Sequence, residues 1–172
     1  MPWQRDDAVF APLLLNKLRS ESRWAARWCV VAWAALSAFL LLLLIGHVFS
    51  VRSAVTAAVP FAFGSAIMHV IAMSELCGVY WYSRKAYRTF SEYSDSALHH
   101  RTGRGALLSA FSQNCAFLAF PLAHFALLSP WLWFPVIGTS AMSLAAARYA
   151  SRTSDLIERF NESNKSTSFI WL

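Results

Sequence analysis

A run of forty-three residues, from Gly105 to Ala147, contains no Lys, Arg, Asp or Glu and has an arginine on either side. Ser129 and Pro130 interrupt this run near its middle. A helix needs about 20 apolar residues to cross a hydrocarbon core about 30 Å thick. The run therefore predicts two membrane-spanning helices joined by a short turn, a hairpin over residues 105–147.

A second apolar region lies earlier in the chain, between Arg27 and Arg84. Only Arg52 near its middle and Glu75 near its end carry charge. We interpret residues 24–82 as another hairpin of two spans. The predicted fold class is therefore all-α and integral to the membrane, with four transmembrane helices arranged as two tight hairpins.

The amino-acid composition is typical of a protein that lies in a lipid bilayer. Hydrophobic residues make up 57% of the 172 residues and charged residues 14%, against about 45 to 50% and about 25% in soluble domains. Four spans leave too few residues for a second globular domain. The net charge of +6 is explained by basic residues kept on the cytoplasmic side of a membrane, so no nucleic-acid binding is expected.

The positions of the basic residues predict the orientation. If there are four spans, Arg52 is the one basic residue on the far side, and the others belong to three segments on the near side. These are Arg5, Lys17, Arg19, Arg23 and Arg27 in the first segment, Arg84, Lys85, Arg88, Arg101 and Arg104 in the second, and Arg148, Arg152, Arg159 and Lys165 in the third. This bias predicts a multi-pass protein with both termini in the cytoplasm. The excess of Arg over Lys and the many alanines are typical of a GC-rich bacterial source, and hence of a bacterial inner membrane. Asp6 and Asp7 precede any apolar run, so no cleavable signal peptide is expected.

Three segments are expected outside the bilayer. Residues 1–23 form an amphipathic helix, which is predicted to lie in the plane of the membrane surface. Residues 83–104 form a cytoplasmic connecting helix and loop. Residues 148–172 form a cytoplasmic tail, whose helix is predicted to break at the polar run 162–168.

Small residues four apart predict close approach of helices within the membrane. The residues assigned to such packing are Ala58, Ala62 and Ala66 in the second span and Gly138, Thr139, Ser143 and Ala147 in the fourth.

Four polar residues within the predicted spans are candidate functional groups, because ionisable and amide side chains are expensive in a bilayer. We expect His69 to form a hydrogen bond with Gln113 or Asn114 between spans. Glu75 lies near the cytoplasmic end of its span, where it is expected to reach water or to pair with Arg84 or another basic residue.

His47 and His124 are predicted to lie at the same depth near the far surface. Together they offer two axial ligands for a haem, which is the cofactor hypothesis that this sequence allows. The three cysteines show neither a C-x-x-C motif nor regular spacing, so no disulfide framework and no metal site is expected.

Large aromatic and aliphatic residues in the cytoplasmic segments predict a surface for a partner protein. They are Tyr87, Phe90 and Tyr93 on the connecting helix, and Phe169, Ile170, Trp171 and Leu172 at the end of the tail.

No Ser-His-Asp order, phosphate-binding loop, H-E-x-x-H motif or paired carboxylates occur in the sequence, so an enzyme is not expected. The leading hypothesis is a non-catalytic subunit of an inner-membrane complex, such as a secretion, transport or energy-converting assembly. The alternatives are a homo-oligomeric pore lined by Gln113, Asn114, Thr139 and Ser143, and a haem-bearing redox anchor. The expected partners are membrane lipid and other membrane subunits or further copies of the chain, with room for a cytoplasmic protein.

Overall fold

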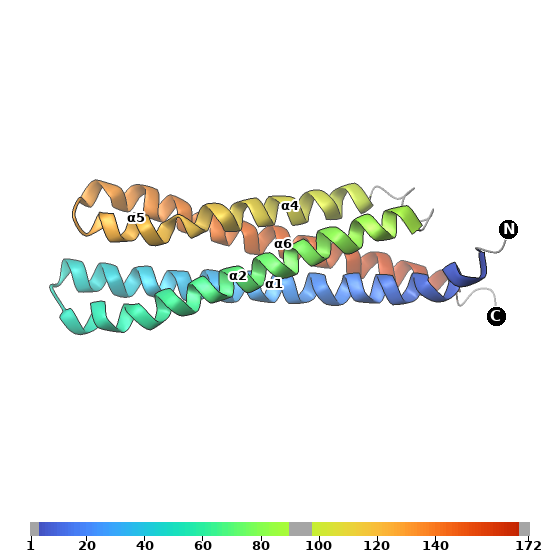
Figure 1. The fold of residues 1–172 in the computed structure, drawn as a ribbon, viewed down its shortest axis with the longest axis horizontal. Coiled ribbons are helices and arrows are strands. Elements are labelled where there is room, and N and C mark those ends of the chain that lie inside the picture. Colours follow the sequence, from blue (N-terminus) through green and yellow to red (C-terminus); the bar gives the residue numbers. More distant parts are fainter. Residues whose placement is uncertain (1–3, 90–97, 169–172) are drawn as a thin grey trace.

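The chain folds into long helices that run back and forth (Figure 1). The computed structural model describes the backbone of residues 4–89 and 98–168, and within them the side chains of residues 13–88, 98–160 and 162. The elements are α1 (Gln4–Val48), α2 (Arg52–Thr89), α4 (Leu98–Phe117), α5 (Ala119–Ala126), the 3-10 turn η1 (Pro130–Leu132) and α6 (Trp133–Ser168). Within these ranges there is no strand, which confirms the all-α prediction.

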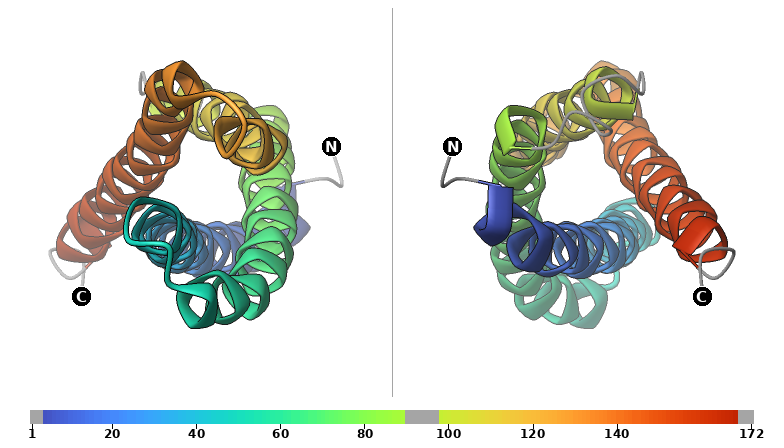
Figure 2. Two further views of the ribbon diagram at one scale, coloured as in Figure 1. Left: turned by 90° about the vertical axis from the view of Figure 1, so that its left-hand side faces the viewer. Right: turned by 90° about the vertical axis from the view of Figure 1, so that its right-hand side faces the viewer.

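The helices form one elongated bundle. The start of α1, the end of α2, the start of α4 and the end of α6 lie at one end, which we call the termini end (Figure 1). The α1–α2 turn and the connection from α5 to α6 lie at the opposite end, the turn end. Viewed along the bundle, the helices form a ring in which α1 and α4 each pack against both α2 and α6 (Figure 2).

Three helical stretches are long and apolar enough to cross a membrane, judged by length and composition: Leu13–Val48, Arg52–Arg88 and Leu98–Ala126. The predicted fourth span in α6 does not meet that criterion. Its apolar part, residues 133–147, rises only about 22 Å before Arg148.

The buried positions of α1 and α2 follow a 3.5-residue repeat, with steps of four and three residues. In α1 they include Leu18, Ser22, Ala25, Cys29, Ala32, Leu36, Phe39 and Leu43, and in α2 Ser65, His69, Ala72, Leu76, Val79, Ser83 and Ala86. This is the period of coiled coils, and it keeps one face of each helix toward its neighbours along the whole bundle.

Many side chains inside the bundle are small and some are polar, whereas many of those on its outer surface are large and apolar. Serine, threonine, histidine and glutamine side chains are buried beside many alanines. Among the exposed apolar side chains, Phe63, Phe111, Phe134 and Ile137 each have more than half of their surface accessible. A soluble bundle has the reverse distribution, so the outer surface is suited to lipid.

Two predictions about the cytoplasmic segments are wrong. Residues 4–23 are the first turns of α1 and form no separate helix in the membrane plane. Leu18 of these turns is fully buried in one cluster with Ile157 of α6, so protein rather than lipid covers the apolar face of this segment. The tail helix does not break at residue 162, because α6 continues to Ser168.

Candidate functional sites

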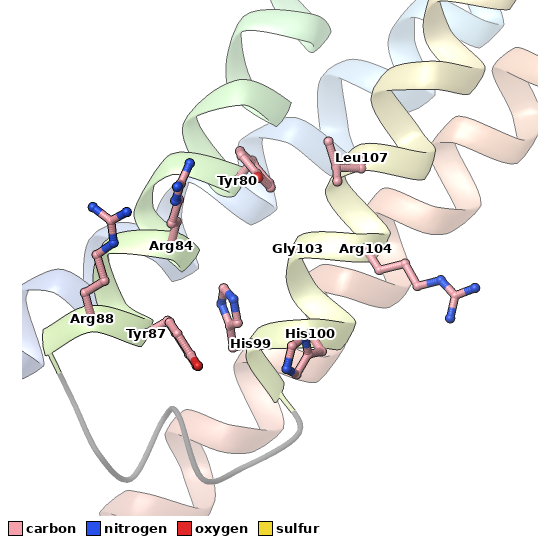
Figure 3. Close-up of a pocket in the computed structure, with 9 residues that line it drawn as sticks. All are labelled: Tyr80, Arg84, Tyr87, Arg88, His99, His100, Gly103, Arg104 and Leu107. Carbon is pink, nitrogen blue, oxygen red and sulfur yellow. The ribbon is translucent and has the colours of Figure 1, made fainter.

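A cleft of about 660 Å³ lies between α2 and α4 at the termini end (Figure 3). Its walls come from the last turns of α2 and the first turns of α4. The lining residues are Tyr80, Arg84, Tyr87, Arg88, His99, His100, Gly103, Arg104 and Leu107. No carboxylate is among these described residues, so the cleft is strongly cationic.

Aromatic contacts hold the two walls together. The ring of His99 stacks on Tyr87, with centroids 4.1 Å apart and 24° between the planes. Nδ1 of His99 also lies 3.3 Å from the hydroxyl oxygen of Ser83. In Figure 3 Tyr87 and His99 lie between the helices. The guanidinium groups point away from this space, those of Arg84 and Arg88 on the α2 side and that of Arg104 on the far side of α4.

A second constellation is a pair of carboxyl groups between α1 and α2. Glu21 and Glu75 lie within hydrogen-bonding reach of each other, and Nζ of Lys17 is 2.7 Å from Oε1 of Glu21. Oε2 of Glu21 would be 3.3 Å from a Cβ at Gly78, so this glycine leaves room for the carboxylate. Adjacent carboxylates repel each other, so the ammonium group of Lys17 beside Glu21 stabilises this arrangement.

The expected pairing of Glu75 with Arg84 is not found among the described side chains, but another basic residue, Lys17, lies nearby. Arg84 lines the cleft between α2 and α4, whereas Glu75 faces Glu21, with Lys17 as the nearby cation. The partner lies 54 positions earlier in the sequence, so no local pattern could have identified it.

Glu158 of α6 joins the extensions of α1 and α6 beyond the predicted bilayer. Its Oε1 accepts hydrogen bonds from the guanidinium groups of Arg19 and Arg23. These two charge-assisted bonds lower the pKa of the Glu158 carboxyl below its ordinary value. The carboxylate therefore remains ionised to lower pH than a free glutamate.

His69 is buried at the middle of the bundle, with 1% of its surface exposed. Its Nδ1 lies 2.8 Å from the carbonyl oxygen of Ser65, one turn earlier in α2. Its ring also packs edge-on against Phe117 and Phe120. The Nε2 atom is buried without a hydrogen-bond partner among the described residues.

The predicted hydrogen bond from His69 to Gln113 or Asn114 is therefore wrong. Gln113 is buried, and neither of its amide atoms has a partner in the described part of the chain. Asn114 is exposed and donates to the carbonyl oxygen of Ala110 at 3.2 Å. The local backbone thus accounts for Nδ1 of His69 and for one hydrogen bond of Asn114, while Nδ2 of Asn114 also lies 3.9 Å from Sδ of Met73 on α2.

The small residues expected at helix contacts are divided between the inside and the outside of the bundle. Ser143, Ala147 and Ala58 are buried within the chain, and Ala62, Ala66 and Thr139 are half-buried. Thr139 donates to carbonyl oxygens of its own helix, those of Pro135 and Val136. Gly138 is exposed, with open space around its Cα.

The two histidines of the haem hypothesis are both exposed near the turn end. His124 lines an apolar groove of about 440 Å³ together with residues of α1 and α2, among them Phe39 and Val59. The lining of this groove does not include His47. Among the described residues there is no group of three metal-binding side chains.

Of the predicted partner surface, Tyr87 is part of the cationic cleft. Phe90, Tyr93 and the terminal tetrapeptide Phe169 to Leu172 lie outside the described residues.

The sequence reasoning missed the cleft, although one signal was present. Arg84 and Arg88 lie four residues apart and thus share a helix face, whereas His99 and His100 fall in the later part of the predicted connecting segment, residues 83–104. The pairing of α2 with α4, which brings the two sets together, is not visible in the sequence.

Comparison of the chain with protein-family models, with curated proteins and with solved structures finds no match.

Proposed function

We propose that this chain is a non-catalytic, multi-pass subunit that assembles with other chains in a bacterial inner membrane, with both termini in the cytoplasm. The large apolar side chains on the outside of the bundle support its placement in lipid. The basic residues support the orientation, because those between Arg84 and Arg104 belong to the ends of α2 and α4 that lie at the termini end.

In this proposal α6 is the fourth span despite its short apolar part. Residues 133–147 are enclosed on one side by the bundle, and the long stem of Arg148 reaches toward the headgroups. A span shorter than the hydrocarbon core is accommodated by local thinning of the bilayer or by a protein neighbour. The exposed Gly138, with nothing within 4 Å of its Cβ position, leaves room for a helix of another chain.

The observation that carries the assembly proposal is the extension of α1 and α6 past the other helices at the termini end (Figure 1). Glu158, bound to Arg19 and Arg23, fastens this helix pair. Leu13 on the pair remains 61% exposed. Arginine is enriched at protein interfaces, and Arg19 and Arg23 lie on the same helix as Leu13.

A photo-crosslinking amino acid at Leu13, in the tagged full-length chain in its native membrane, tests this proposal. We expect one or a few defined adducts with another protein, identified by mass spectrometry after purification in mild detergent. The matched control places the same amino acid at Leu41, which is 58% exposed in the apolar run near the turn end of α1 and should give lipid adducts. Leu13 adducts that match those at Leu41 would contradict the proposal.

The same experiment separates the alternatives. An adduct of two copies of this chain would favour the homo-oligomeric pore, and haem absorption in the purified protein would favour the redox anchor.

A homo-oligomeric pore requires its lining residues to share one outer face of the chain. Gln113 and Ser143 are buried inside one chain, whereas Asn114 is exposed, so the described structure does not bring them onto one outer face.

A further inference from the structure

We propose that the cationic cleft between α2 and α4 binds the phosphate of an anionic phospholipid. This inference concerns a ligand of the chain itself and does not require the companion proteins proposed above. It is based on the charge, the shape and the surroundings of the cleft.

The charge of the cleft is available for a ligand. Three arginines, Arg84, Arg88 and Arg104, line it. The ion pairs between described side chains involve Lys17, Arg19 and Arg23, and none of the three cleft arginines. A guanidinium group binds a phosphate through two parallel hydrogen bonds, and long flexible stems allow groups at the rim to turn inward.

The shape of the cleft is held open by the protein itself. Gly103 has no side chain at its position on α4, and a Cβ there would come no closer than 4.0 Å to Cε2 of Tyr80. The stacking of Tyr87 on His99 fixes the distance between the two walls. Little rearrangement is therefore needed before a ligand of headgroup size enters.

The surroundings favour a lipid over a soluble phosphate compound. Leu107 lines the cleft on its side toward the turn end and is 54% exposed. Phe111, one turn further along α4, is 63% exposed. A phospholipid places its phosphate among the arginines and its acyl chains along these side chains, whereas a free phosphate gains nothing from them. Basic pockets between helices on the cytoplasmic side bind lipid headgroups in this way.

Native mass spectrometry of the full-length protein in detergent, with phosphatidylglycerol or phosphatidylcholine added, tests the inference. We expect the wild type to bind phosphatidylglycerol about tenfold more strongly than phosphatidylcholine. The triple variant Arg84→Gln, Arg88→Gln, Arg104→Gln should lose this preference. The matched control, Arg52→Gln, Arg152→Gln, Arg159→Gln, removes the same charge from exposed positions outside the cleft and should keep it. Equal losses in the two triple variants would overturn the proposal, because binding would then depend on net charge alone.

Two further measurements test whether binding depends on the shape of the cleft and whether its ligand is a lipid or a free phosphate ester. Gly103→Leu fills the cleft without changing its charge and should also abolish the preference. Leu107→Trp, which narrows the cleft from an exposed position, serves the same purpose if the first variant does not fold. Retained preference in a folded Gly103→Leu protein would contradict the site. Glycerol 1-phosphate, which has the phosphate but no acyl chains, should fail to displace bound phosphatidylglycerol at millimolar concentration. Displacement would show that the cleft binds free phosphate esters, and the lipid proposal would be wrong.

Discussion

The two halves of the bundle, α1 with α2 and α4 to α6, differ in how they are built. The first half consists of two unbroken helices of 45 and 38 residues with a three-residue connection. In the second half the α-helical hydrogen-bond pattern is interrupted at Leu118, although its backbone dihedrals stay helical. The chain then turns between α5 and α6, where the 3-10 turn lies. Both helices of the first half are apolar enough to cross a membrane, but only one stretch of the second is.

The two halves also contribute different side chains to the core at the turn end. α1 supplies large ones, Leu36, Phe39, Leu40 and Leu43, whereas α4 and α5 supply four alanines, at positions 116, 119, 123 and 126. Large side chains from one half thus fill the space over small ones from the other, which permits close packing. The second half is therefore specified by its small residues as much as by its hydropathy.

The largest effect is expected from a large side chain placed in the second half. Ser143 of α6 is completely buried, so Ser143→Leu should lower the free energy of unfolding by about 3 kcal/mol through overpacking. Thermal unfolding in detergent measures this loss. Leu41→Phe, on the outward face of the first half, should have almost no effect. Similar losses in the two variants would remove the distinction between small inner and large outer positions.

The tight turn between α1 and α2 should not tolerate an added side chain at Gly46. A Cβ at Gly46 would lie 2.5 Å from Cγ2 and 3.0 Å from the backbone nitrogen of Val55. Gly46→Ala should therefore destabilise the protein by about 2 kcal/mol, because backbone must move. Gly64→Ala in the middle of α2 is the control. Nothing lies within 4 Å of its Cβ position, so the better helix propensity of alanine should stabilise it by up to about 1 kcal/mol. A neutral Gly46→Ala would show that the turn is looser than described.

The contact between α4 and α6 should show a smaller and reversible effect. A Cβ at Gly105 would clash with Oγ1 of Thr153, whose hydroxyl donates to the carbonyl oxygen of Tyr149 at 2.8 Å. In Gly105→Ala the threonine must rotate and lose this bond, at a loss of about 1 kcal/mol. Thr153→Ala in the same chain should restore most of the stability, as measured by a double-mutant cycle. Additive losses would show that the two positions do not touch.

These differences explain how much the sequence could reveal. The apolar runs and the helical class were visible because length and charge alone define them. The 3.5-residue repeat was also present, in Ser22, Ala25, Cys29 and Ala32, but inner and outer positions of a membrane helix are almost equally apolar. The repeat therefore does not stand out in the sequence, whereas the ridges of small residues four apart do. The pairing of Glu21 with Glu75 and the walls of the cleft depend on contacts between distant segments, which no local pattern encodes.

The smallest effect concerns the ion pairs that join the halves at the termini end. The folded-state pKa of Glu158 is lowered by Arg19 and Arg23, so its contribution to stability is present above the carboxyl's ordinary pKa and is lost as the pH falls through the lowered value. Glu158→Gln should therefore have a slightly lower melting temperature than the wild type at pH 7. The difference should disappear in acid. A difference that persists well below pH 4 would assign the effect to packing.

Cysteine labelling tests most directly whether the second half crosses the membrane twice. In a chain whose native Cys29, Cys77 and Cys115 are replaced by alanine, single cysteines are placed at Ser129, in the turn before α6, and at Lys165, near the end of α6. With a membrane-impermeant maleimide, the account predicts labelling of Ser129→Cys in intact cells and of Lys165→Cys only after the membrane is opened. Labelling of Lys165→Cys in intact cells would contradict it, because the chain would then have three spans and α6 would lie outside the cytoplasm.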